Sequence, residues 1–299
     1  MADAFVIETS DLRKHFGPVE AVRGLDLRVP PGSIYGFLGR NGAGKTTTLK
    51  MLLGMTRPTS GAARVFGLAA DGVRSSVEIR CRTGFVSEDK DLYDYMRVDE
   101  IVRFTAAFYP RWRRDLEERY LRTFELPGGR RIKTLSRGMR TKLALLLAFC
   151  RGAELLILDE PTSALDPAAV EEVLHALVTH VAREEMTVLF SSHQIAEVDQ
   201  VADHVAIIDR GRAVVAGALD DVRDRYRRVQ LVFDGEAPAA AFQAGGIARV
   251  RREGRVLSVI ASDGVDRVLD EARALSPVSV DVAPVTLKEI FLESVRTED

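Results

Sequence analysis

The sequence predicts an α/β fold with three layers in its larger first part, followed by a small α+β domain. Short apolar strands alternate with helical segments between residues 34 and 209, as in α/β domains. The run at residues 155–158 (LLIL) is entirely apolar, which is typical of a central parallel strand that is buried on both faces. After about residue 224 the pattern changes to short strands around one helix. We therefore expect one domain at 1–224 and an accessory domain at 225–299.

The first fifty residues predict a sheet, a glycine-rich loop and a helix in that order. Apolar runs beginning at residues 5 and 21 predict two N-terminal antiparallel strands, which end at the turn Pro30-Pro31-Gly32. A shorter apolar strand is predicted at 34–38. Glycines dominate residues 39–44, and the segment 45–53 (KTTTLKMLL) has helical character.

An inserted helical subdomain is predicted at about 88–150. Apolar residues in the stretch 88–126 recur at spacings of three and four, which indicates helices, and a further helix is predicted at 137–150. Helices at 170–183 and 195–202 then alternate with strands at 187–190 and 205–209. In the C-terminal domain we expect strands within 227–233, 255–261 and 277–282, a helix at 264–275 and a final amphipathic helix at 287–295.

The composition is that of an ordinary globular protein. The chain has 299 residues, of which 46% are hydrophobic and 29% charged, so it is not expected to be disordered. The longest wholly apolar run, residues 143–150, is far shorter than a membrane span, and the acidic, polar N-terminus does not resemble a secretory signal. Cys81 and Cys150 have no metal-ligand or redox spacing and are expected to be reduced structural thiols. These features favour the cytoplasm.

The charge balance gives no general argument for nucleic-acid binding. Lys and Arg number 42 against 44 Asp and Glu, which leaves a formal charge of -2. A local bias exists at residues 111–142, where 11 basic residues face 4 acidic ones. Two interpretations stay open, a solvated helical face or a surface that meets a partner.

The glycine-rich segment carries the most specific motif. Residues 39–46 match G-x-x-x-x-G-K-[ST] and lie after a predicted strand and before a predicted helix, as the phosphate-binding loop requires. Backbone N–H groups would surround the β-phosphate, Lys45 would reach the β- and γ-phosphate oxygens, and the Thr46 hydroxyl would ligate Mg²⁺. The alternative is a glycine turn with a chance lysine. The nucleotide-binding candidates here are Gly39, Arg40, Asn41, Gly42, Ala43, Gly44, Lys45, Thr46 and Thr47.

Two acids follow the most apolar predicted strand. Asp159 is suited to hold Mg²⁺ through water, and Glu160 is suited to polarise an attacking water. Paired carboxylates at a strand tip are costly unless a positive group faces them, and a Mg²⁺-nucleotide would supply that group. A purely structural role is the alternative.

With these motifs in place, about the first 220 residues resemble the ATP-binding subunits of ABC transporters. The segment 135–139 (LSRGM) is similar to the family's LSGGQ signature, which implies that Ser136 and Gly138 serve the nucleotide of a partner subunit. The segment 163–166 (SALD) matches the D-loop, with Asp166 as a site residue. His193 matches the switch histidine. Phe16 occupies the place where the family stacks an aromatic ring on adenine, although a core position is the alternative.

Two departures from the family pattern are present. Glu88 stands where the family usually has Gln after the strand GFVS. A carboxylate there could still ligate Mg²⁺, but it adds negative charge next to Asp159 and Glu160, which puts the hydrolysis rate in question rather than binding. In the signature, Arg137 and Met139 replace Gly and Gln.

The resemblance implies an ATPase subunit that drives a separate membrane permease, of the type that exports drugs, antibiotics or lipids. Two cassettes, alike or different, would close head to tail over two ATP molecules with Mg²⁺. Glu160 would activate water, His193 would bridge to the γ-phosphate, and Lys45 would neutralise developing charge. The subunit would lie peripherally on the inner face of the membrane, and no nucleic-acid partner is expected.

The stretch 88–126, with Tyr93, Tyr95 and Trp112, is the predicted docking surface for the permease. Two other functions remain as alternatives. One is a soluble ABC ATPase that acts on ribosomes or DNA, although such relatives generally carry paired cassettes or a long coiled coil. The other is a nucleotide-dependent regulator that hydrolyses poorly, which Glu88 would explain.

Overall fold

The computed structural model describes residues 5–163, 165–239, 242, 245–262 and 264–295, so Ala164 of the predicted D-loop lies outside the described residues. Contacts divide the chain into two compact units, residues 1–213 and 214–299. The expected domain boundary at 224/225 lies further along the chain than this division and stays a prediction.

The first unit begins with an antiparallel sheet. Its strands run in the order β2-β1-β4-β5 and comprise β1 (Ile7–Phe16), β2 (Val19–Val29), β4 (Ser60–Val65) and β5 (Leu68–Ala69). Alternation in β2 sets its orientation, because Leu25, Leu27 and Val29 are buried while the residues between them are exposed. One face of this sheet therefore belongs to the core.

A six-stranded sheet in the order β10-β9-β3-β8-β7-β6 has five of its strands in this unit, while β10 begins there and continues past residue 213. The pairs β9–β3, β3–β8, β8–β7 and β7–β6 are parallel. Because parallel strands end at the same edge, the residues that follow β3 and β7 come together. The bounds are β3 (Ile34–Gly39), β6 (Thr83–Val86), β7 (Leu155–Asp159), β8 (Thr187–Ser192), β9 (His204–Asp209) and β10 (Arg212–Ala218).

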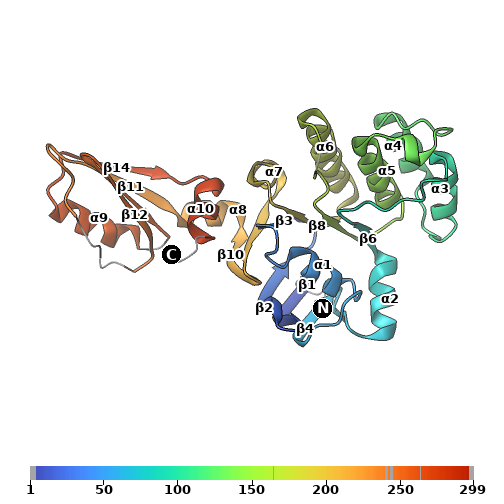
Figure 1. Ribbon diagram of the computed structural model, residues 1–299, viewed down its shortest axis with the longest axis horizontal. Coiled ribbons are helices and arrows are strands. Elements are labelled where there is room, and N and C mark those ends of the chain that lie inside the picture. The colour runs from blue at the N-terminus through green and yellow to red at the C-terminus, as the bar shows by residue number, and fades with distance from the viewer. Residues whose placement is uncertain (1–4, 164, 240–241, 243–244, 263, 296–299) are drawn as a thin grey trace. The chain divides into compact units, whose positions relative to one another are not determined.

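Helix α1 (Lys45–Leu52) packs between the two sheets, with contacts to β2, β3, β4 and β7 (Figure 1). The core there joins Leu25 and Leu27 of the antiparallel sheet to Leu49 of α1 and Ile157 of β7. Helices α6 (Pro167–Glu184) and α7 (Ile195–Val201) lie on the other side of the central sheet, and α2 (Val73–Arg82) precedes β6. The predicted three-layer α/β core is confirmed.

The inserted helices are α3 (Val98–Ala106), α4 (Arg114–Thr123) and α5 (Arg137–Phe149), with a 3₁₀ turn at Ile132–Thr134. Helix α5 is the centre of this group, since it contacts α3, α4, α6 and β6. Its residues from Leu143 to Phe149 are all buried. A helix that is apolar on all sides is typical of such a central position.

The second unit has a sheet and core of its own. Its antiparallel strands run in the order β12-β13-β11-β14, and α9 packs on one face of the sheet, where Val268 and Ala272 meet Val229 and Val259. The elements are α8 (Leu219–Arg225), β11 (Arg227–Val232), β12 (Ile247–Glu253), β13 (Val256–Ala261), α9 (Val265–Ala274), β14 (Ser279–Pro284) and α10 (Leu287–Ser294).

None of the helices in the described part of the chain combines the length and the apolar character needed to cross a bilayer.

Candidate active site

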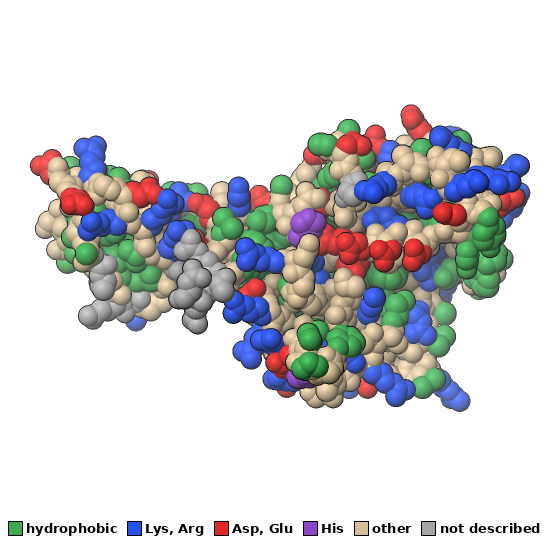
Figure 2. Space-filling model, in the orientation of Figure 1, with side chains coloured by type: hydrophobic (Ala, Val, Ile, Leu, Met, Phe, Trp, Pro, Cys, Tyr) green, Lys and Arg blue, Asp and Glu red, His purple; other side chains and the backbone are tan. Residues whose placement is uncertain are grey.

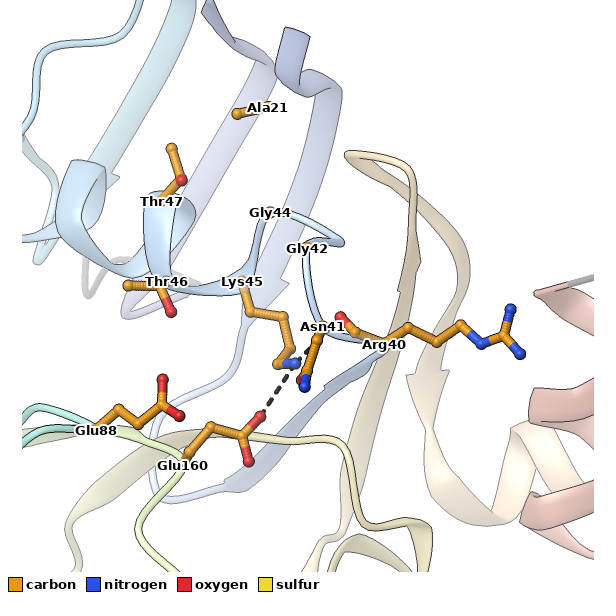
Figure 3. A pocket seen from close by; sticks show the side chains of 10 residues that line it. All are labelled: Ala21, Arg40, Asn41, Gly42, Gly44, Lys45, Thr46, Thr47, Glu88 and Glu160. Atoms are coloured by element: carbon orange, nitrogen blue, oxygen red, sulfur yellow. Dashed lines mark hydrogen bonds and ion pairs between the residues drawn. The ribbon is translucent and has the colours of Figure 1, made fainter. Parts of the chain in front are cut away.

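The loop between β3 and α1 borders a pocket of about 350 Å³ (Figure 3). Gly44 has φ 102°, and a Cβ atom at this position would lie only 2.4 Å from the carbonyl oxygen of Ala21, so only glycine fits. The chain then enters α1, whose first N–H groups have no partner within the helix and favour an anion. The pocket is lined by Ala21, Arg40, Asn41, Gly42, Gly44, Lys45, Thr46, Thr47, Glu88 and Glu160.

Two of the predicted loop residues support the pocket without lining it. A Cβ atom at Gly39 would lie 2.7 Å from the carbonyl oxygen of Ile208 in the neighbouring strand β9. Ala43 is buried in the core between the sheets. These residues therefore allow the loop to pack closely against the strands beneath it.

Lys45 is held by three oxygens at the base of the pocket. Its Nζ donates to the carbonyl of Gly39 at 2.8 Å and to that of Arg40 at 3.4 Å, and it lies 3.0 Å from Oε1 of Glu160 (Figure 3). Both side chains of the ion pair are only 6% exposed. A buried cation needs such partners. A phosphate that binds here would take the place of the Glu160 carboxylate beside Lys45.

The two acids at the end of β7 have different surroundings. The Ser191 hydroxyl donates to Oδ1 of Asp159 at 2.6 Å, and the N–H of Glu160 donates to the same hydroxyl oxygen at 3.0 Å. Asp159 is 1% exposed. Glu160 has φ 48°, in the left-handed region that non-glycine residues rarely adopt. Such a conformation persists where the surroundings fix it, often at a functional site.

His193, which follows β8, completes the contacts of Glu160. Its Nδ1 lies 2.8 Å from Oε2 of Glu160, and its side chain is 42% exposed. Hydrogen bonds that involve Glu197 on α7 hold the loop that carries His193. The Ser192 hydroxyl donates to Oε2 of Glu197 at 2.8 Å, and the N–H of Gln194 donates to that hydroxyl oxygen. Burial raises the pKa of Glu197, whereas the hydroxyls of Thr162 and Ser192 lower it in part.

Glu88 lines the same pocket from the segment that follows β6, and Lys90 lies next to it. The Lys90 Nζ donates to the carbonyl of Glu88 at 3.0 Å and to the carbonyl of Glu160 at 3.3 Å. Burial lowers the pKa of Lys90, and the carboxylates of Glu88, Asp159 and Glu160 oppose this effect. Lys90 therefore connects the loop of Glu88 to the end of β7.

The oxygen ligands predicted for Mg²⁺ suit that ion. Mg²⁺ prefers oxygen ligands and usually binds through one or two carboxylates together with substrate phosphates. Thr46, Asp159 and Glu88 offer only oxygens. Within the described residues no group of three or more His, Cys, Asp or Glu side chains could hold a metal alone. The residues therefore fit a Mg²⁺ ion that arrives with a nucleotide.

Ser136, Gly138 and Asp166 do not line this pocket. Ser136 is the N-cap of α5, where its hydroxyl accepts from the N–H of Met139 at 3.2 Å. Asp166 is the N-cap of α6 and accepts from the N–H of Ala169 at 3.0 Å. Ser136 and Asp166 are exposed and Gly138 is half-buried, and none of the three contributes to the pocket of its own chain.

Phe16 is 52% exposed at the end of β1, with Nζ of Lys14 4.9 Å from its ring centroid. The alternative that it belongs to the core is therefore wrong. An exposed aromatic ring beside a cation is suited to stack on a planar, electron-rich group.

Sequence reasoning did not find Lys90 and Glu197. Both lie close to predicted residues, since Lys90 is two positions after Glu88 and Glu197 is four positions after His193. These spacings were the available signal. Their partners, however, come from segments that are distant in the sequence, such as the carbonyl of Glu160 for Lys90.

The comparisons with known proteins agree on one family. The profile of the family described as ABC transporter matches residues 22–163. The bacitracin transport ATP-binding protein BcrA of Bacillus licheniformis is 35% identical over 75% of this chain and 73% of its own length. The daunorubicin resistance ATP-binding protein DrrA3 of Streptomyces coeruleorubidus is 31% identical over 99% of this chain and 95% of its own. A solved ATP-binding subunit of an ABC transporter is 28% identical, with a TM-score of 0.66 over 74% of this chain and 92% of its own.

Proposed function

The chain belongs to the ABC transporter ATP-binding proteins, and from this premise we propose that it is the ATPase subunit of an exporter for a drug, antibiotic or lipid-like compound. ABC ATP-binding subunits hydrolyse ATP, pair as cassettes and work with separate permease components. The proposal adds the direction of transport, the class of cargo and the residues that act. It also places the subunit on the cytoplasmic face of the membrane.

The contacts of the pocket residues support a role for each of them in the proposed mechanism. The loop N–H groups and Lys45 hold the β- and γ-phosphates, so Lys45 must leave Glu160 when ATP binds. The freed Glu160 carboxylate then accepts a proton from the attacking water. Its second oxygen contacts His193, which keeps the carboxylate oriented and itself lies near the γ-phosphate. Mg²⁺, held by Thr46, Asp159 and Glu88, would neutralise phosphate charge.

The complete site includes residues of a second subunit. Ser136 and Gly138 of one cassette would contact the nucleotide in the pocket of the other, and Asp166 would lie at the same interface. Their exclusion from the pocket of their own chain supports this arrangement. ATP would then draw two subunits together, and hydrolysis would release them.

An exposed aromatic surface is the proposed permease contact. Tyr93, Tyr95, Phe104 and Phe108 are 51%, 69%, 42% and 65% exposed. The ring centroids of the pairs Tyr93–Tyr95, Tyr93–Phe104 and Phe104–Phe108 lie 5.1 to 5.9 Å apart. Contiguous exposed rings of this kind mark protein interfaces. Trp112, also predicted here, is half-buried and donates to Glu117 at 2.6 Å.

One observation carries the proposal: the pocket of this chain assembles Lys45, Glu160 and the phosphate loop, in a chain whose relatives are named for bacitracin transport and daunorubicin resistance. The test is affinity capture of the tagged chain from detergent-solubilised membranes of its host, with ATP present, followed by mass spectrometry. We expect one polytopic membrane protein in stoichiometric amount. Ribosomal or DNA-associated proteins in its place would overturn the transport function and leave the ATPase chemistry intact.

A matched variant connects the capture to the aromatic surface. Tyr95→Ser with Phe108→Ser should lose the membrane protein and still bind ATP, because neither residue lines the nucleotide pocket. The cargo class is tested by drug sensitivity in a host that lacks the gene. Wild type should restore resistance to a peptide antibiotic, an anthracycline or a membrane-active lipid, and Glu160→Gln should not.

A further inference from the structure

A short turn after β6 is fixed by one lysine side chain. The N–H of Lys90 donates to the carbonyl of Ser87 at 3.2 Å, which closes the turn. The ammonium of Lys90 then donates to the carbonyls of Glu88 and Glu160. Lys90 and Glu160 have φ values of 50° and 48°, so both are non-glycine residues in the left-handed region. Two unfavourable backbone conformations are thus linked by the same side chain.

The turn lies among carboxylates. Four carboxylates raise the pKa of Lys90 against the larger, opposite effect of its burial, namely those of Glu88, Asp89, Asp159 and Glu160. Figure 2 shows a row of acidic side chains beside a histidine on the face drawn there. Asp159 and Glu160 are 1% and 5% exposed. Carboxylates that surround one ammonium group, two of them largely out of water, repel one another.

A second cation in contact with this cluster, Lys45, is already paired with one of the carboxylates. Lys45 forms its ion pair with Oε1 of Glu160. The Asp159 carboxylate accepts a hydrogen bond from a neutral group, the Ser191 hydroxyl, and Glu88 is exposed. Lys90 is half-buried, and the carboxylates of both Glu88 and Asp159 raise its pKa, so its ammonium is a positive charge that acts on these two carboxylates together.

We propose that Lys90 is a positioning residue that acts as a built-in countercharge: it holds the turn of Glu88 against the carbonyl of Glu160 and offsets the carboxylates while no Mg²⁺-nucleotide is bound. The inference rests on the proposed Mg²⁺-ATP site and adds the form of the site before binding. It also accounts for Glu88, because a carboxylate at this position is tolerable when a cation follows two residues later.

The first test compares stability without nucleotide or metal. Lys90→Met should lower the thermal midpoint of the full-length chain by about 2–4 °C, whereas Lys90→Arg, which keeps the charge, should lower it less. In the Glu88→Gln background the same Lys90→Met change should cost clearly less, because one carboxylate has been removed. If the effects of Lys90→Met and Glu88→Gln on the thermal midpoint are additive, Lys90 only holds the turn in place and the countercharge is refuted.

The second test follows Mg²⁺ in the presence of ATP. Removal of a neighbouring cation should let Mg²⁺ bind more tightly, so Lys90→Met should reach half of its thermal stabilisation at an about three-fold lower Mg²⁺ concentration than wild type. If Lys90 acted only by holding the turn, its loss would displace Glu88 and weaken Mg²⁺ binding. A higher Mg²⁺ midpoint in Lys90→Met would therefore contradict the countercharge. An unchanged midpoint also contradicts the proposal.

Lys133→Met is the matched control, because this exposed lysine lies in the 3₁₀ turn and does not line the nucleotide pocket. It should resemble wild type in both tests. The same measurements distinguish a failure of the proposed function from a failure of the role of Lys90. If the wild-type chain is not stabilised by ATP and Mg²⁺, the proposed function fails. If it is stabilised but Lys90→Met behaves like Lys133→Met, only the inference about Lys90 fails.

Discussion

Glu160 lies between Lys45 and His193, since one of its carboxylate oxygens contacts Lys45 and the other contacts His193. This position has two consequences. In the proposed mechanism the carboxylate would occupy the phosphate position beside Lys45 until a nucleotide arrives, and it would already be oriented when Lys45 leaves it. The acid proposed to activate water would thus also neutralise the proposed phosphate-binding lysine before ATP binds.

Replacement of Glu160 by Gln separates these roles. The amide keeps the size of the side chain but cannot accept the proton of water, so we expect ATP turnover to fall by about 100-fold or more. ATP should still bind, and the variant should accumulate as an ATP-bound dimer in gel filtration. Glu118→Gln, an exposed change on α4, should have neither effect. Nearly wild-type turnover in Glu160→Gln would instead favour the poorly hydrolysing regulator.

His180 makes the stability of the chain depend on pH. It is 1% exposed, its ring stacks on Phe149 with centroids 4.1 Å apart, and its Nδ1 lies 3.1 Å from the Tyr120 hydroxyl. Burial lowers its pKa to about 4. The unfolded chain, in which a histidine has a pKa near 6.5, therefore takes up the proton first, and stability falls as the pH drops from about 6.5 towards 4.

We expect the free energy of unfolding to fall by about 2 kcal/mol between pH 7 and pH 5 from this residue. Urea unfolding at both pH values measures it. His180→Gln should remove most of this loss, whereas His175→Gln, an exposed change on the same helix, should keep it. The same pH slope in His180→Gln and wild type would show that other groups cause the acid sensitivity.

At the scale of the elements, the sequence predicted the strands and helices that have a clear apolar period. The buried strand at 155–158 and the helix at 137–150 are confirmed as β7 and α5, each within a residue or so of the expected ends. The elements that escaped prediction have weak patterns. Helix α2 buries only Ser76 and Ile79, and β12 contains three arginines. Which face of these elements is buried depends on the neighbouring elements that pack on them, and the pattern of their own residues does not show it.

The parts of the site that have a local sequence pattern were predictable, as were the elements with a clear apolar period. The phosphate loop is one run of contiguous residues, and the two acids at the end of β7 are another. A short motif therefore describes each of them. The pairing of Glu160 with Lys45 and the role of Lys90 depend on contacts between segments that are about 70 or more residues apart. No local pattern records such a contact.

The N-cap of α5 tests whether Ser136 has a function beyond its helix. Ser136→Ala removes a hydrogen bond to the N–H of Met139 and should cost about 1 kcal/mol of stability. Thr286→Ala is the matched control, because Thr286 caps α10 in the second unit in the same manner. Only Ser136→Ala should also lower ATPase activity and ATP-dependent dimerisation. Equal activity in both variants would limit Ser136 to its structural role.

At the scale of the whole molecule, the division into two units predicts that ATP binding is independent of the C-terminal domain. Every residue that lines the nucleotide pocket lies in the first unit, and the second unit has a core of its own. A chain that ends at Asp224 should therefore fold and bind ATP with a dissociation constant within about three-fold of the full chain, a difference below 1 kcal/mol. Isothermal titration calorimetry measures this, and residues 225–299 expressed alone should give a cooperative thermal transition as the companion test. A truncated chain that folds but loses ATP affinity would mean that the accessory domain acts on the nucleotide site. If affinity is kept while capture of the permease fails, the domain serves assembly of the transporter.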